Sequence, residues 1–178
     1  MRKFLVFIPL AVLAIGCGAG TKSSGGGGTT SSGKPVVSET ANAVTTVKAG
    51  EALTLTEDIL GSKTIAAITL TNVRYGYKAA NSFDKPNKGQ YVVADVAVTV
   101  NAGKFSINSA SFKLVGADGT AYDSTFISSV EMLSANDLTP GQKSSGSVAF
   151  DVPKGAEKGA RIALKNILAD GDAGYWTL

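Results

Sequence analysis

The feature that most constrains this chain is the alternation of side chains along residues 90–100, QYVVADVAVTV. Every second position is aliphatic: Val92, Ala94, Val96, Val98 and Val100. An alternation of period two that is rich in β-branched residues is typical of a strand with one buried face. Tyr91, Asp95 and Thr99 should lie on the other face. Residues 144–152 repeat the pattern and place Phe150 on the inward side.

Further apolar segments, among them one long for a strand (residues 65–77), predict additional strands. They lie at residues 52–55, 65–77, 111–115, 120–122, 161–164 and 175–178. The apolar positions of residues 65–77 change parity near Asn72, which predicts a bulge or a break there. Trp176 is expected in the core or at its edge rather than as a ligand platform. Seven or so short strands separated by turns predict an all-β, antiparallel β-sandwich.

Turn-forming residues separate these segments. Asp118-Gly119 suits a hairpin, and Pro140-Gly141 suits a type II turn ahead of a strand. The sequence contains no convincing amphipathic helix of ten or more residues. Residues 126–135, FISSVEMLSA, leave two alternatives open: one or two helical turns, or a loop that crosses the sandwich.

Residues 1–16 have the pattern of a secretory signal peptide. Arg2 and Lys3 precede an uncharged apolar run, residues 4–15, which is too short to span about 30 Å of hydrocarbon comfortably as a helix. Cys17 follows the small residues at the end of this run and is the only cysteine in the chain. A single cysteine excludes an intramolecular disulfide and a metal site built from cysteines alone.

Ala14-Ile15-Gly16-Cys17 resembles the lipobox of bacterial lipoproteins, although position −3 of that motif is usually Leu. In that family the cysteine sulfur receives a diacylglycerol, and cleavage makes the cysteine the new N-terminus. The resemblance implies lipidation of Cys17, acyl chains such as palmitate, and a membrane-anchored, extracytoplasmic protein at the cell surface or periplasmic face. The alternative is an ordinary secreted protein with an incidental cysteine.

A spacer and one domain follow the signal peptide. Residues 18–34 consist almost entirely of Gly, Ser and Thr, which cannot bury apolar surface. Residues 17–42 are therefore expected to form a disordered, flexible linker; about 25 such residues reach roughly 25–30 Å. Residues 43–178 are expected to form one folded domain.

Four segments of this domain, taken in order, resemble a large family of bacterial lipoprotein domains of unknown function. They are residues 89–101, 111–122, 138–142 and 146–153. The family is similar in fold to a small secreted mycobacterial immunoprotective antigen, an immunoglobulin-like sandwich. The resemblance covers about residues 45–178. It implies an immunoglobulin-like antiparallel β-sandwich, and it brings no enzyme activity, cofactor or established ligand.

Several kinds of chemistry are disfavoured by composition. The chain has no histidine, which removes Ser-His and Cys-His pairs and every histidine-ligated metal site. Ser-x-x-Lys occurs at residues 31–34 and 82–85, but the companion motifs of penicillin-binding enzymes are missing. Asp151, Asp170 and Asp172 lack the spacing of a calcium loop and are interpreted as solvated turn carboxylates. We expect no enzyme activity, no metal and no cofactor.

Charge disfavours a nucleic-acid partner. Residues 1–16 contain two of the 17 basic residues and none of the 14 acidic ones, so the chain from residue 17 onward has a net charge of +1. The formal charge of the whole chain is therefore no sign of a basic, nucleic-acid-binding surface.

One segment offers a candidate binding surface, because cations and aromatic rings alternate along it. Its residues are Arg74, Tyr75, Tyr77, Lys78, Lys85 and Lys88, with Phe83 interleaved. Such residues can bind anionic polymers or stack on sugars. The alternative is a long loop, residues 79–88, with solvated lysines and core-facing tyrosines.

The sequence thus predicts a membrane-anchored, non-enzymatic binding or interaction module at the cell envelope. Its partner would be an envelope protein or an anionic wall polymer. An accessory structural subunit of an envelope or transport complex is the alternative, and an envelope hydrolase is disfavoured.

Overall fold

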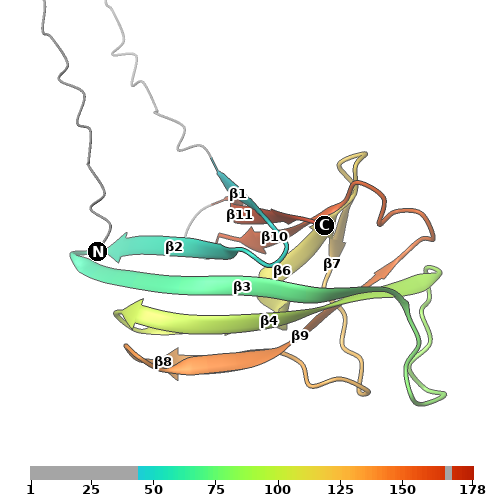
Figure 1. Cartoon of the computed structure of the whole chain (residues 1–178), viewed down its shortest axis with the longest axis horizontal. Helices are drawn as coiled ribbons and strands as arrows, with labels where there is room; N and C mark the ends of the chain where they lie inside the picture. Colours follow the sequence, from blue (N-terminus) through green and yellow to red (C-terminus); the bar gives the residue numbers. More distant parts are fainter. Residues whose placement is uncertain (1–43, 167–169) are drawn as a thin grey trace, which may run out of the picture. The chain divides into compact units, whose positions relative to one another are not determined.

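The computed structural model describes residues 44–166 and 170–178, and these ranges consist mainly of strands (Figure 1). The signal peptide, Cys17 and the linker of the sequence analysis lie outside the described residues. None of the helical structure in the described ranges is long and apolar enough to cross a bilayer.

The strands follow one another with only one short 3₁₀ helix among the described residues. In chain order they are β1 (Thr45–Lys48), β2 (Ala52–Ile59), β3 (Ser62–Tyr77), β4 (Gln90–Ala102), β5 (Phe105–Asn108), η1 (Ser109–Ser111, the 3₁₀ helix), β6 (Phe112–Val115), β7 (Ala121–Asp123), β8 (Ser134–Leu138), β9 (Lys143–Val152), β10 (Arg161–Lys165) and β11 (Asp172–Thr177).

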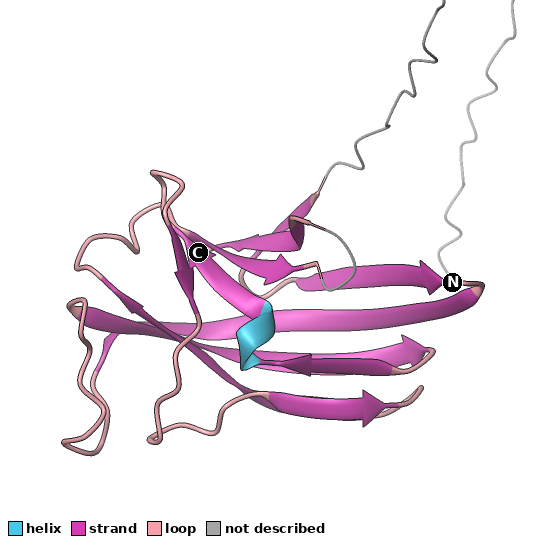
Figure 2. Ribbon diagram, turned by 180° about the vertical axis from the view of Figure 1, so that it is seen from behind, coloured by secondary structure: helices cyan, strands magenta, loops and turns pink. Residues whose placement is uncertain are grey.

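These strands form two main sheets and a small ribbon (Figure 2). The first sheet has the order β1-β11-β10-β6-β7, the second has the order β2-β3-β4-β9, and β5 pairs with β8. Every pair within the sheets is antiparallel except β1 and β11, which run parallel. The predicted all-β sandwich is confirmed, with one parallel pair added to it.

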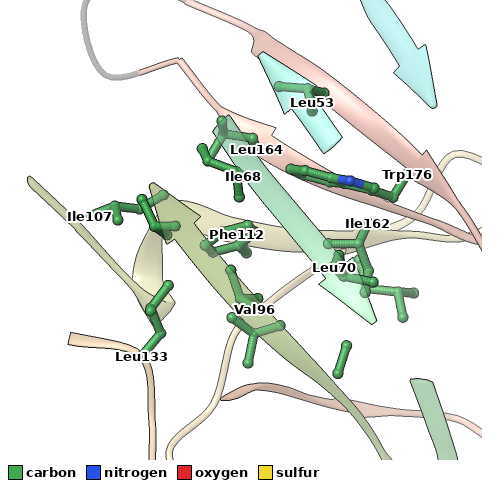
Figure 3. Packing of buried hydrophobic residues seen from close by; sticks show 14 of the residues in the cluster. Leu53, Ile68, Leu70, Val96, Ile107, Phe112, Leu133, Ile162, Leu164 and Trp176 are labelled. Carbon is green, nitrogen blue, oxygen red and sulfur yellow. The ribbon is translucent and has the colours of Figure 1, made fainter. Parts of the chain in front are cut away.

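The core lies between the two main sheets (Figure 3). The alternate residues of β4 predicted to be buried are all at most 1% exposed, and Phe150 of β9 is fully buried beside them. Phe112, Leu114 and Ile162 of the first sheet belong to the same cluster. Trp176 of β11 is fully buried, as predicted, and its ring lies 6.1 Å from that of Phe112. Burial of these apolar surfaces is the main force that holds the two sheets together.

Two contacts join β2 of the second sheet to β11 of the first. The indole Nε1 of Trp176 donates a hydrogen bond of 3.2 Å to the carbonyl oxygen of Glu51, which immediately precedes β2. Gly174 faces the buried Leu53 so closely that a Cβ added to Gly174 would lie 2.1 Å from Leu53 Cδ1. A side chain at position 174 would therefore force Leu53 or the two sheets to shift.

The predicted break near Asn72 is confirmed as a bulge in β3. The register with β4 passes from Thr71 opposite Asp95 to Arg74 opposite Val93. Asn72 adopts a φ of 48°, a conformation that Asn tolerates better than most residues. Because the bulge inserts a residue, side chains beyond it change face, and Arg74 joins Asp95 on the outer side of the sheet.

The outer face of the second sheet carries a second apolar cluster. Tyr91, Val93, Ile127 and Ala149 are buried in it, and Tyr77, Val130 and Met132 pack against it. The prediction that β4 has only one buried face is wrong at this position, because residues of the 124–133 loop, Ile127 among them, cover its outer face. Of the two alternatives for residues 126–135, the helix is excluded: the segment is a loop that leads into β8.

Candidate functional site: a basic pocket beside the β3–β4 loop

The loop between β3 and β4 and the start of the loop after β9 line an open pocket of about 480 Å³. Three lysines lie in its wall: Lys78 and Lys85 from the first loop, and Lys154 from the second. All three residues are exposed. We call this site the basic pocket.

None of the three lysines of the basic pocket takes part in an ion pair among the described residues. The ion pairs of the described residues join Arg74 to Asp95, Lys113 to Asp172 and Lys165 to Asp123. None of them involves a lysine of the pocket. Ammonium groups gathered without partners raise the local positive potential, which favours an anion.

Asp84 is the acidic residue of the pocket wall, and its carboxylate is already engaged. Its Oδ2 accepts hydrogen bonds from Asn81 Nδ2 (2.9 Å), from the backbone N–H of Ser128 (2.8 Å) and Ser129 (3.2 Å), and from Ser128 Oγ (2.9 Å). These bonds, that from the Asn81 side chain foremost, lower the pKa of Asp84. Asp84 therefore stays ionised and ties the β3–β4 loop to the loop of residues 124–133.

The other end of the β3–β4 loop is fixed to β9. The carboxylate of Asp151 accepts hydrogen bonds from the backbone N–H groups of Asn87 (2.7 Å) and Lys88 (3.0 Å). Gly89 then passes close to the end of β9, with a φ of 142°, and a Cβ added to it would lie 3.3 Å from the backbone nitrogen of Lys154. This close approach brings Lys154 to the pocket, so backbone and carboxylate contacts within the domain hold the site.

Arg74 belongs to a separate polar network on the outer face of the sheet. Its Nη2 lies 2.7 Å from Asp95 Oδ1, and its guanidinium lies 5.6 Å from the ring of Tyr77. Burial would raise the pKa of Asp95, but hydrogen bonds from Asn72, Arg74 and Ser147 outweigh it and lower the pKa. The charge of Arg74 is therefore compensated within the domain.

The six sequence-predicted surface residues divide into two groups. Tyr77, Lys78 and Lys85 line the basic pocket. Arg74, Tyr75 and Lys88 do not line it. Arg74 pairs with Asp95, and Tyr75, 48% exposed, lies on the face of β3 opposite to Arg74. The ammonium of Lys88 lies 5.3 Å from the ring of Tyr122. Burial, and then the negative charge of Glu157, raise the pKa of Tyr75.

Sequence reasoning missed Lys154, Asn81 and Asp84 as members of the site. Lys154 directly follows Pro153, which marks the end of β9, but it is far from the β3–β4 loop along the chain. The spacing of Asn81 and Asp84 could have indicated their part in the site, because an Asn two or three residues before such positions often closes a tight turn. Here the Asn81 side chain accepts hydrogen bonds from the backbone N–H groups of Phe83 and Asp84.

The acidic residues considered for a metal site have other partners or positions. Asp151 holds the β3–β4 loop, as described above. Asp172 pairs with Lys113 at 2.8 Å and accepts a hydrogen bond of 2.7 Å from Tyr175 Oη. Asp170 is exposed. Among residues 44–166 and 170–178, no group of three or more side chains of the metal-binding types lies together.

Comparison with known proteins supports the fold described above. The chain is similar to MPT63, a secreted protein from Mycobacterium tuberculosis, with a TM-score of 0.58 and 22% identity over 75% of this chain and 96% of that chain. It is also similar to the yjhA protein from Bacillus subtilis, with a TM-score of 0.54 and 18% identity over 70% of this chain and 85% of that one. At these identities the likeness shows the fold alone.

Sequence comparison identifies the family. No curated protein matches the chain significantly. Residues 62–173 match a family described as a domain of unknown function. This match spans β3 to the start of β11 and confirms the resemblance noted from the order of motifs. The chain belongs to the DUF4352 family.

Proposed function

We propose that this protein is a lipid-anchored, extracytoplasmic binding module that holds an anionic partner at the basic pocket. The observation that carries the proposal is a set of three lysines, Lys78, Lys85 and Lys154, which form no ion pair with any described residue and surround a pocket whose loops are already fixed. A site that is fixed before binding loses less conformational entropy when the ligand arrives.

Binding, rather than catalysis, fits the groups in the pocket. The chain has no histidine, and the pocket wall contains no serine, threonine or cysteine that a base could activate. Its acidic member, Asp84, accepts several hydrogen bonds and has a lowered pKa, so it is a poor general base near neutral pH.

The extracytoplasmic location is supported by two observations. The signal-peptide pattern of residues 1–16 ends at Cys17 in a sequence that resembles a lipobox. The fold is also similar to that of MPT63, a secreted protein. An acylated Cys17 would anchor the chain in the membrane through residues 17–42, and two or more acyl chains hold far better than one.

The chemistry of the pocket favours a phosphate- or carboxylate-rich partner of the cell envelope. Each lysine presents a compact ammonium with three donors, which suits phosphate as a point charge. Tyr77 and Asn81 add polar groups to the same wall. Such binding should weaken as the salt concentration rises, because the exposed charges are screened.

Photo-crosslinking in living cells tests this proposal. A photoreactive amino acid replaces Ala80, which is exposed in the β3–β4 loop, and the partner captured on irradiation is identified. The triple variant K78A/K85A/K154A should lose the captured partner. The matched control K48A/K63A/K143A removes three exposed lysines outside the pocket and should retain it. Equal capture by both variants would contradict the proposed role of the pocket.

A further inference from the structure

Two exposed phenylalanines stand on the loops that Asp84 joins. Phe83 in the β3–β4 loop is 93% exposed, and Phe126 in the loop of residues 124–133 is 74% exposed. Both loops extend beyond the sheets on the same side of the domain in the two views (Figures 1 and 2). A single exposed apolar residue needs no explanation, but two large rings on joined loops form a feature that suggests a contact.

The backbone around Phe83 is fixed. Asn81 Oδ1 accepts hydrogen bonds from the backbone N–H of Phe83 (2.9 Å) and of Asp84 (2.8 Å). The carbonyl oxygen of Phe83 in turn accepts one from the backbone N–H of Lys85 (3.1 Å). The exposure of the Phe83 ring is therefore a property of an ordered turn.

Phe126 is directed outward by its neighbours. The backbone N–H of Thr125 donates a hydrogen bond of 2.7 Å to the carbonyl oxygen of Ala149 in β9. Ile127 is fully buried in the second apolar cluster. The backbone of Ser128 is bound to Asp84. With the chain held on both sides and Ile127 inside, the ring of Phe126 is left in solvent.

We propose that this loop end docks onto an anionic phospholipid surface, with Phe83 and Phe126 inserted among the lipids and the lysines of the basic pocket beside the headgroup phosphates. This inference rests on the proposed function and names the partner of the same site. Aromatic rings on projecting loops, flanked by lysines, combine the two attractions that hold proteins at an anionic membrane interface.

A membrane fits these observations better than a soluble polymer. Neither Phe83 nor Phe126 lines the basic pocket, so a soluble anion held there would leave both rings in water. A lipid surface supplies phosphates for the lysines and an apolar layer for the rings at once. A protein partner would need a separate hollow for each projecting ring.

The charges around the loop end favour the same partner. Three acidic residues lie near the pocket, and all accept hydrogen bonds from the domain itself. Asp84 binds the backbone of Ser128, Asp151 binds the β3–β4 loop, and Glu157 binds the backbone N–H of Gly155 at 2.7 Å. The lysines, in contrast, form no ion pair among the described residues, so their ammonium groups are available to headgroup phosphates, whereas the carboxylates are already engaged.

An anchored domain needs only weak affinity to stay docked. If Cys17 is acylated, the linker holds the domain close to the same bilayer, and docking becomes an intramolecular step with a high effective concentration. Two rings and three lysines are then enough to orient the domain against the membrane.

Vesicle binding tests the inference on the complete chain from Cys17 onward, with Cys17→Ser to remove the anchor. Vesicles of phosphatidylcholine and phosphatidylglycerol in equal parts are compared with vesicles of phosphatidylcholine alone. The chain should bind the anionic vesicles at least tenfold more tightly. The variant F83S/F126S should lose at least tenfold in affinity for them.

A matched control removes two exposed apolar side chains elsewhere. The variant V44S/L60S changes Val44, 44% exposed, and Leu60, which is fully exposed, and should alter vesicle binding less than twofold. If F83S/F126S binds anionic vesicles as tightly as the control, the membrane inference is wrong. Because both rings are exposed, thermal melting of F83S/F126S should match that of the parent chain.

A soluble poly(glycerol phosphate) separates this inference from the proposed function. F83S/F126S should bind this polymer as the parent chain does, while K78A/K85A/K154A should lose both the polymer and the vesicles. Unchanged binding of the polymer and the vesicles by the lysine variant would overturn the proposed function. Vesicle binding that is equal with and without phosphatidylglycerol would overturn the anionic-membrane inference alone.

Discussion

The close approach of the two sheets at Gly174 and Leu53 leads to a quantitative prediction. Gly174→Ala adds a methyl group that would lie 2.1 Å from Leu53 Cδ1 and 3.1 Å from both Cδ2 and Cγ. Contacts that short cannot persist, so the Leu53 side chain or the two sheets must move. Leu53 is only 1% exposed, so the side chain has little free space into which to rotate.

The expected effect of Gly174→Ala is a modest loss of stability. Overpacking a core costs about 1–3 kcal/mol. The lower entropy of the unfolded chain with Ala offsets about 0.4–1 kcal/mol. The free energy of unfolding should therefore fall by about 1–2 kcal/mol. Leu53→Ala alone should cost about 2–5 kcal/mol through its cavity.

The double variant provides the decisive comparison. In L53A/G174A the added methyl enters space that Leu53 has vacated, so its cost should be smaller than the sum of the two single costs by about 1 kcal/mol or more. Urea unfolding followed by fluorescence of Trp176, the only tryptophan, measures all four chains. Additive costs, or a Gly174→Ala chain as stable as the parent, would show that the two sheets do not meet closely at these residues.

Three further predictions concern other parts of the chain. Trp176→Phe removes the hydrogen bond to the Glu51 carbonyl and part of the core, and should cost about 2 kcal/mol. Urea unfolding followed by circular dichroism measures this, since the variant has no tryptophan. The pKa of Asp84 is lower in the folded protein than in the unfolded chain, where it is about 3.9. The stabilisation by ionised Asp84 is therefore complete above about pH 3.9 and is lost as the pH falls through the folded pKa. Asp84→Asn should flatten this part of the acid-unfolding curve. Cys17→Ser should abolish labelling by a fatty-acid analogue in cells, and a variant that is still labelled would contradict lipid anchoring.

The sequence predicted the strands that carry strong alternation, because burial of one face dictates their side chains. β4 and β9 were located to within two residues at each end, and the bulge at Asn72 followed from the change of parity in β3. β1, β5 and β8 were not predicted. Each is short, and β8, SANDL, has one buried residue, Ala135, so its pairing with β5 leaves little trace in the sequence.

The second apolar cluster could not be predicted from the alternation along β4 either. Tyr91 and Val93 occupy the positions of β4 that alternation assigns to the outer face. They are buried because a distant loop, through Ile127, covers that face. Covering by another segment is a tertiary effect that period-two patterns do not contain.

The candidate site was predicted in part. Lys78 and Lys85 were named because cations and aromatics cluster along one segment, and both line the pocket. The pairing of Arg74 with Asp95 depends on the bulge, which turns Arg74 to the outer face. Lys154 reaches the pocket only through the close approach of Gly89, a tertiary contact without a sequence signature.

The parallel pairing of β1 with β11 bears on when this domain can fold. β1 is the first and β11 the last strand of the described residues, and Thr45 of β1 lies opposite Gly174 of β11. A chain that emerges N-terminus first therefore presents β1 long before its partner β11 exists, and the core lacks Trp176 until β11 appears. Contacts between such distant residues form slowly. The domain is expected to remain unfolded while it emerges, which is the state in which a polypeptide can be threaded through a narrow export channel.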